Sequence, residues 1–286
     1  MGTGRVELML ANKGRVVVSV ANDALLKLAR VVAVSAAELA RTRRVAGVEV
    51  AASKSSLEDV VTHADREVEI LIRSMLADAR STDGFYGEEG AADAGSSGLT
   101  WVVDPIDGTV NYLYGIPQYA VSIAVVEGEP DPLTWRALAG VVVNPVSGEV
   151  FTATVDGGAA LDSSPIAVNT GVSLDQALVG TGFSYSSESR TAQGVVLAGL
   201  IGQVRDIRRH GAAALDLCSV ACGRLDAYYE RGLQPWDHAA GALIAREAGA
   251  SVTGLNGRPP SARFTLAAAP DLAVKLEQTL GKLGIN

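Results

Sequence analysis

The chain has 286 residues, of which 48% are hydrophobic and 20% charged, and its formal net charge at pH 7 is −8. This length allows one large domain or two of ordinary size, and either can bury a substantial core. Lys and Arg are dispersed along the sequence, which argues against a nucleic-acid-binding surface because phosphate backbones require clustered cations. The only cysteines, Cys218 and Cys222, are spaced one helical turn apart, and we interpret them as reduced, buried thiols.

The N-terminal 20 residues fit no clear periodic pattern and predict a loosely ordered extension. Residues 13–20 resemble the beginning of a signal peptide, but Asn22 and Asp23 interrupt the apolar run. No segment reaches about 18 uninterrupted apolar residues, so a membrane span is not expected. We therefore expect a soluble, cytoplasmic protein.

Helical periodicity precedes strand-like patterns in the first part of the chain. Apolar residues at helical spacing predict helices over 22–44 and 65–79, with a loop over 54–62 between them. An acidic, Gly- and Ser-rich stretch over 91–98 follows a short predicted strand that ends near 85–87. Short strands with the spacing of an antiparallel meander are predicted at 100–103, 119–126, 138–143 and 149–154.

Beyond residue 165 strands and helices alternate. Strands are expected near 178–180, 204–208 and 227–230, and helices near 192–201, 212–222 and 236–248, before a strand pair and a C-terminal helix from 271. The pattern therefore predicts an α+β half over 1–165 followed by an α/β half over 166–286.

The most informative segment is Trp101–Thr109, in which Asp104 and Asp107 flank a proline-fixed turn after a predicted strand. Proline holds its own φ and biases Asp104 toward an extended conformation, so that the two carboxylates can converge on one point. Gly108 permits close backbone approach, and a helix beginning at Thr109 would point N–H groups toward a phosphate. Hard oxygen ligands without nearby thiolate or imidazole indicate magnesium. An isolated Asp-x-x-Asp is more often an ordinary turn, so this interpretation depends on further motifs.

Four segments, in order, resemble the signatures of the inositol monophosphatase family of lithium-sensitive, metal-dependent phosphatases, and actinobacterial members most closely. The similarity runs from about Ala21 to the C-terminus. The four segments are Lys54 to Asp65 around a mobile loop, Gly87 to Glu89, Asp104 to Thr109, and Trp236 with Asp237. The resemblance implies a layered α-β-α-β-α sandwich of the inositol monophosphatase and fructose-1,6-bisphosphatase type, two to three Mg²⁺ per site, and a homodimer.

The family's metal ligands carry over by position. Glu88, Asp104 and the backbone carbonyl of Ile106 match the ligands of a first magnesium ion. Asp104, Asp107 and Asp237 match those of a second, with Asp104 bridging. Two like charges about 4 Å apart repel by about 4 kcal/mol at an effective dielectric near 20, so four carboxylates in an empty cleft would repel a phosphate. Metal is therefore expected to serve binding as well as chemistry.

The catalytic residues implied by the resemblance are Asp65, Glu88 and Thr109. Thr109 and Asp65 match the pair that orients and deprotonates the attacking water, while Glu88 would also help to hold a third, weaker ion. Lys54 is assigned a possible role in the mobile loop. Leu57 and Glu58 replace the proline-containing turn that is common in the family, which leaves the third site and lithium sensitivity in doubt.

The residues that the resemblance implies for substrate binding lie in both halves. Asp107, Gly108 and Thr109 would contact the phosphate or a neighbouring hydroxyl. Ala213 matches the position that offers its backbone N–H, and Glu230 matches the carboxylate that binds ring hydroxyls. A carboxylate aimed at vicinal hydroxyls suits a polyol and fits a nucleotide or a hydrophobic ester poorly.

These patterns predict a magnesium-dependent hydrolase of inositol 1-phosphate in which water attacks directly, without a phosphoenzyme. Fructose 1,6-bisphosphate is the runner-up substrate, and histidinol phosphate and phosphoadenosine phosphate are further alternatives. The metal site does not distinguish them because it contacts only the phosphate group. A non-catalytic regulatory binding protein is a distant alternative. Such a protein would usually lack a metal ligand, and none of the matching positions is altered.

Overall fold

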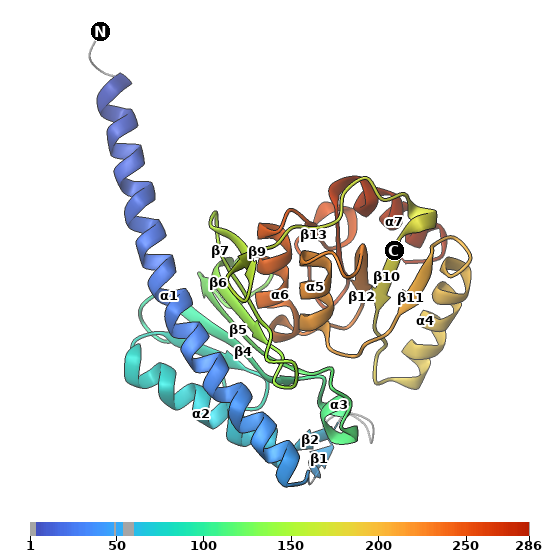
Figure 1. Ribbon diagram of the computed structural model, residues 1–286, viewed down its shortest axis with the longest axis horizontal. Coiled ribbons are helices and arrows are strands. Elements are labelled where there is room, and N and C mark those ends of the chain that lie inside the picture. The colour runs from blue at the N-terminus through green and yellow to red at the C-terminus, as the bar shows by residue number, and fades with distance from the viewer. Residues whose placement is uncertain (1–3, 49, 54–59, 286) are drawn as a thin grey trace.

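The computed structural model describes residues 4–48, 50–53 and 60–285, and for 4–20, 50–53 and 60–61 it gives the course of the backbone alone. Lys54 and the Leu57–Glu58 pair, for which loop roles were predicted, lie outside the described residues. The described part forms five layers in which helices and sheets alternate (Figure 1). The layered sandwich implied by the family resemblance is confirmed.

The first half builds a seven-stranded sheet in the order β3-β4-β5-β6-β7-β8-β9. Its strands pair antiparallel except for β3 with β4, which run parallel. The predicted meander is therefore confirmed from β4 to β7. The strands are β3 (Gly84–Gly87), β4 (Leu99–Asp107), β5 (Ala120–Glu127), β6 (Arg136–Val143), β7 (Val150–Thr154), β8 (Gly158–Leu161) and β9 (Ser164–Pro165).

The second half builds a five-stranded mixed sheet in the order β11-β10-β12-β14-β13. Strand β10 runs parallel to both of its neighbours, and β14 runs antiparallel to both of its own. The strands are β10 (Leu178–Thr181), β11 (Asp206–Arg208), β12 (Ala227–Glu230), β13 (Ser251–Thr253) and β14 (Thr265–Ala268). A separate small hairpin joins β1 (Val50–Ser53) and β2 (Val60–Thr62).

Helices cover both faces of each large sheet (Figure 1). α1 (Gly4–Ala46) and α2 (His63–Ala79) pack on the outer face of the seven-stranded sheet, where they share a core with it. α5 (Ala213–Ala221) and α6 (Pro235–Glu247) fill the layer between the sheets and form a second core with both. α4 (Ser187–Leu200) and α7 (Pro270–Lys282) close the far side.

Two sequence expectations need correction. Residues 1–20 were expected to form a loosely ordered extension, but α1 begins at Gly4 and continues without a break to Ala46. Helix α4 begins at Ser187 and not near 192, because the Ser186 side chain caps it by accepting from the Ser189 N–H. No helix within the described ranges is long and apolar enough to cross a membrane.

Strand β4 carries Asp104 and Asp107 at its C-terminal end, and its pairing with β5 changes register between them. Asp104 lies opposite Ser122 and Asp107 opposite Ala120, so three steps on β4 match two on β5. This is a bulge, and Pro105 lies inside it, where the missing N–H removes no regular ladder bond. The bulge brings both aspartates to one end of the sheet.

Helix α2 provides a test of the outer core. Ile72 is completely buried between α1 and the sheet, whereas Ile70 on the same helix is 67% exposed. Ile72→Ala is expected to lower the free energy of unfolding by about 2–5 kcal/mol through lost burial and a residual cavity. The matched variant Ile70→Ala should stay within about 0.5 kcal/mol of the parent. Urea unfolding midpoints measure both, and equal midpoints would contradict the observed packing.

Candidate active site

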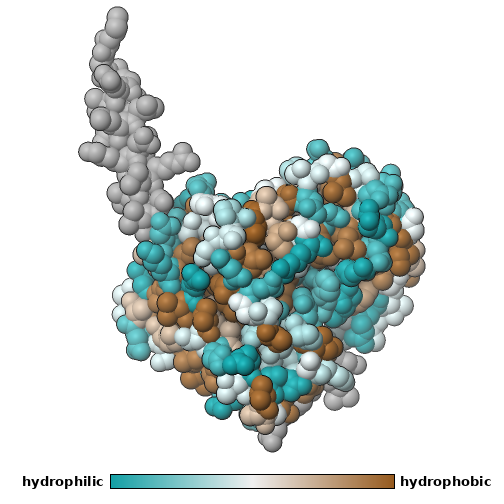
Figure 2. Space-filling view, in the orientation of Figure 1, coloured by the Kyte–Doolittle hydropathy of each residue, from teal (hydrophilic) through white to brown (hydrophobic). Residues whose placement is uncertain are grey.

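A cavity of about 500 Å³ lies between the two halves of the chain and contains most of the predicted site residues. From the first half it is lined by Glu88, Asp104, Ile106, Asp107, Gly108 and Thr109. From the second half Ala213, Glu230 and Asp237 line it, together with Arg209 and Arg231. On the face shown in Figure 2 hydrophilic and hydrophobic residues are interspersed, and the outline is notched between the two lobes.

Asp107 links the two halves through backbone hydrogen bonds. Its Oδ1 accepts from the Ala213 N–H at 3.2 Å and its Oδ2 from the Ala214 N–H at 2.7 Å, so that it caps the start of α5. The carboxylate is favourably placed there because a helix N-terminus carries partial positive charge. The N–H of Ala213, which the family resemblance assigns to the substrate, is therefore engaged by Asp107 in this structure.

The turn after β4 depends on a glycine. Gly108 has φ +91°, and a Cβ at this position would lie 3.0 Å from the carbonyl oxygen of Gly211 and 3.1 Å from that of Gln118. Asn111, in the first turn of α3 (Thr109–Tyr114), donates through Nδ2 to the carbonyls of Gln118 and His210, both at 2.7 Å. These contacts fix the segment before α5 against the aspartate-bearing turn.

Asp237 lies at the third position of α6, where it closes a capping box. Its Oδ2 accepts from the Gln234 N–H at 2.6 Å, and Pro235 begins the helix. The predicted start of a helix at Trp236 and Asp237 is confirmed to within one residue. The capping role and a metal-ligand role are compatible because a carboxylate oxygen has more than one lone pair.

Glu69 is a buried carboxylate that the sequence analysis did not identify. Its Oε2 accepts from the Glu89 N–H at 2.8 Å, and a Cβ at Gly87 or Gly90 would collide with its carboxylate. Arg73 lies one turn further along α2 and donates to the Ala91 carbonyl at 3.0 Å. Glu69 and its neighbour thereby anchor the loop that carries Glu88. The spacing of Glu69 on a buried helix face was the only signal for it.

The carboxylates that line the cavity repel one another. Burial, followed by the negative charges of Glu88, Asp107 and Asp237, raises the pKa of Asp104 well above its usual value. Burial and Asp237 raise the pKa of Asp107, although the two α5 amides oppose this effect. Burial and Glu88 likewise raise the pKa of Asp237. Among the described residues that line the cavity, the carboxylates outnumber the cations, which are Arg209 and Arg231.

Thr109 and Asp65 are in contact, as the family resemblance implies. The Thr109 hydroxyl lies 3.2 Å from Asp65 Oδ1 and 3.2 Å from the Ile106 carbonyl oxygen, and its single hydrogen can be donated to either. Asp65 Oδ2 accepts from the N–H and the hydroxyl of Thr62, which caps α2. Burial raises the pKa of Asp65 to about 6 despite these bonds.

Glu230 stands at the end of β12 with its carboxylate packed against backbone. A Cβ at Gly182 would lie 1.9 Å from Glu230 Oε2, so only glycine leaves room for this position of the side chain. The Tyr228 hydroxyl donates to the same oxygen. Burial raises the pKa of Glu230 to about 7, while the hydrogen bond from Tyr228 and the charge of Arg209 favour the ionised form. Gly182 and Tyr228 were not identified from the sequence.

The donor set suits a hard divalent cation. Among the residues that line the cavity there is no cysteine and no histidine, and carboxylate oxygens dominate. Within the described residues, however, no three His, Cys, Asp or Glu side chains already stand as a group that could hold a metal ion. Asp104, Asp107 and Asp237 instead accept backbone N–H groups. The fit therefore rests on donor chemistry and on the excess of carboxylates over cations among the described lining residues.

The sequence matches the family model described as "Inositol monophosphatase family" over residues 16–283. The chain belongs to the inositol monophosphatase family. The inositol-1-monophosphatase SuhB of Mycobacterium tuberculosis is 47% identical over 234 residues, which cover 78% of this chain and 79% of that protein. The resemblance to actinobacterial members is thereby confirmed.

Another relative within this family carries a different name. The Pseudomonas aeruginosa protein called Nus factor SuhB is 41% identical over 214 residues, covering 73% of this chain and 77% of that protein. The crystal structure of extragenic suppressor protein suhB from Bartonella henselae superposes with a TM-score of 0.83 at 35% identity. That match covers 91% of this chain and 99% of the other.

The repulsion among the carboxylates predicts how the metal-free protein responds to pH. An unfolded Asp has a pKa near 3.9, whereas native Asp104 holds its proton to higher pH. Native protein therefore binds more protons than unfolded protein above that value, and stability falls as the pH rises. Asp104→Asn removes the charge and keeps an oxygen for the Ile106 N–H.

In EDTA at pH 7.5 the melting temperature of Asp104→Asn should exceed that of the parent by at least about 2–4 °C, the shift that roughly 1 kcal/mol produces in a chain of this size. The difference should shrink as the pH is lowered toward 5, and added Mg²⁺ should reverse its sign. Thermal unfolding followed by circular dichroism measures all three conditions. A parent that is the more stable protein in EDTA at pH 7.5 would contradict the electrostatic account.

Proposed function

We propose that this protein is a Mg²⁺-dependent hydrolase of small polyol phosphates, with inositol 1-phosphate as its first candidate substrate. The observation that supports this most directly is the cavity itself, which combines clustered carboxylates, the Thr109–Asp65 contact and Glu230 within one space or at its wall. Family membership supports a phosphatase activity, and Glu230, the residue proposed to contact the polyol, supports the substrate class.

The groups proposed to hold the metal are the side chains of Glu88, Asp104, Asp107 and Asp237 and the carbonyl of Ile106. Bound divalent cations would neutralise these carboxylates, stabilise charge on the phosphoryl group and acidify water near it. Without the cations, a phosphate dianion would meet a cavity of its own sign. Metal removal is therefore expected to reduce binding as well as turnover.

Thr109 and Asp65 are proposed to orient the nucleophilic water. When the Thr109 hydroxyl donates to Asp65, its oxygen retains lone pairs that can accept a hydrogen from water in the cavity. The water oxygen forms the new bond to phosphorus, the ester P–O bond breaks, and the departing alkoxide takes a proton from solvent to become the polyol. The pKa of Asp65, about 6, is close enough to neutral pH for its carboxylate to receive the proton that the water loses.

Glu230 supports a polyol as the departing group. An ionised carboxylate accepts hydrogens from two neighbouring hydroxyls, and Tyr228 and Gly182 hold it in one position. Its carboxylate lines the same cavity as the metal-site residues, so that phosphate and ring would be bound together. Fructose 1,6-bisphosphate remains the runner-up, with histidinol phosphate and phosphoadenosine phosphate behind it.

The relative named Nus factor SuhB favours a second candidate, the regulatory binding role weighed in the sequence analysis. The two roles are compatible in one protein. We put the enzyme first because none of the carboxylates discussed above is replaced in this chain.

A phosphate-release assay tests the proposed activity. Inositol 1-phosphate, fructose 1,6-bisphosphate, histidinol phosphate and 3′-phosphoadenosine 5′-phosphate are compared at saturating Mg²⁺. EDTA should abolish turnover and Mg²⁺ should restore it. Asp104→Asn should lower kcat by about 10²–10³-fold, as removal of groups that stabilise transition-state charge does in other enzymes. Hydrolysis that survives EDTA, or release from none of the four substrates, would refute the proposal.

Gly182 allows a separate test of the polyol contact. Gly182→Ala must displace the Glu230 carboxylate, because the added Cβ would overlap it. We expect KM for inositol 1-phosphate to rise about tenfold, while hydrolysis of 4-nitrophenyl phosphate, which has no hydroxyls to bind, changes much less. Gly202→Ala is the matched control, since a Cβ there meets nothing within 4 Å. Equal losses of activity on both substrates would show that Glu230 does not bind the polyol hydroxyls.

A further inference from the structure

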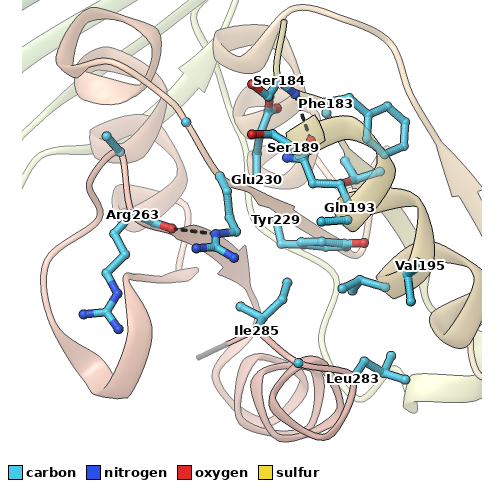
Figure 3. Close-up of a pocket in the computed structure, with 18 residues that line it drawn as sticks. Phe183, Ser184, Ser189, Gln193, Val195, Tyr229, Glu230, Arg263, Leu283 and Ile285 are labelled. Carbon is cyan, nitrogen blue, oxygen red and sulfur yellow. Dashed lines mark hydrogen bonds between the residues drawn. The ribbon is translucent and has the colours of Figure 1, made fainter. Parts of the chain in front are cut away.

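A second cavity of about 580 Å³ adjoins the active-site cavity (Figure 3). Both cavities are lined by residues 182–184 and 230–232, so they share one boundary at the ends of β10 and β12. The second cavity extends from this boundary over the far face of the five-stranded sheet, between α4 and the segment that follows α7. The carboxylates and Thr109 of the metal site do not line it.

The walls of this second cavity combine apolar side chains with a few polar groups. Phe183, Tyr229, Val195, Leu283 and Ile285 supply the apolar surface (Figure 3). Gln193 uses its Oε1 to accept from the Ser184 N–H at 2.9 Å, which leaves its NH₂ group available. Such a mixture of apolar walls with a few convergent polar groups is typical of small-molecule sites.

The charges in the second cavity differ from those in the first. Among the described residues that line it, Glu230 at the shared boundary is the only one with a carboxylate side chain. Arg231 and Arg263 also line it, but the Arg263 side chain points away from the cavity (Figure 3). Arg231 donates through Nε to the Arg263 carbonyl at 3.2 Å, and this bond directs its guanidinium while leaving its other N–H groups for a ligand. The cavity therefore does not suit a further divalent cation, and it does suit hydroxyl oxygens.

From this continuity and lining we infer that the second cavity binds a second polyhydroxylated ring joined to the phosphate-bearing polyol. This inference rests on the proposed phosphatase function. Glu230 would bind hydroxyls of the first ring, and Arg231, Gln193 and Ser184 would bind those of the second. The substrate class is then a glycosylated polyol monophosphate, with the apolar faces of the second ring against Phe183 and Val195.

The test compares inositol 1-phosphate with a set of its mono-glucosylated derivatives that differ in the hydroxyl carrying the glucose. The parent enzyme should hydrolyse at least one derivative with a kcat/KM equal to or above that of inositol 1-phosphate. Ala192→Trp, on the exposed α4 wall, should fill the cavity. It should lower the ratio of kcat/KM for the glucosylated derivative to kcat/KM for inositol 1-phosphate about tenfold. Ala198→Trp is the matched control, because Ala198 is exposed on the same helix outside the cavity. It should leave the ratio unchanged.

Each outcome decides a different point. If no substrate is hydrolysed at saturating Mg²⁺, the proposed function itself fails. If inositol 1-phosphate is hydrolysed but every glucosylated derivative is rejected, the second-ring site is refuted and the phosphatase stands. The same refutation follows if Ala192→Trp and Ala198→Trp give the same ratio while both retain the parent's melting temperature.

Discussion

The mutual repulsion of carboxylates in one buried cavity is the constraint on which the rest of this structure depends. Asp104, Asp107 and Asp237 are held in place by backbone amides and a strand bulge, and each has its pKa raised by burial and by its neighbours. A protein optimised for stability alone would not gather these charges. Local features that lower folding stability, such as these clustered charges, are expected where binding or catalysis requires them.

The two halves of the chain are connected through the same residues. Asp107 at the end of β4 caps α5, and Asp237 opens α6, so the helices between the two sheets begin at the cavity. Gly108 permits the close approach that these bonds require. The packed layer of α5 and α6 thus gives the cavity a rigid base, which suits a site that must bring separate ligands together.

The polyol side of the cavity is organised by different contacts. Glu230 is fixed by Tyr228 and by the absence of a side chain at Gly182, and beyond it the wall passes into the second cavity. A metal centre determines only that a phosphate is bound, whereas these neighbours decide what may be attached to it. Differences in substrate between members of the family are expected to arise at this boundary, because residues such as Arg231 that line it are not metal ligands.

The fold class, the order of most elements and the motif residues could be predicted from the sequence, because periodicity and the Asp104–Thr109 signature are local features. It did not reveal the start of α1 at Gly4, nor the anchoring role of Glu69. That Gly182 makes room for Glu230, and that a second cavity adjoins the first, became visible only in the folded chain. Those facts depend on contacts between segments far apart along the chain, and no local pattern of residue types encodes such distances.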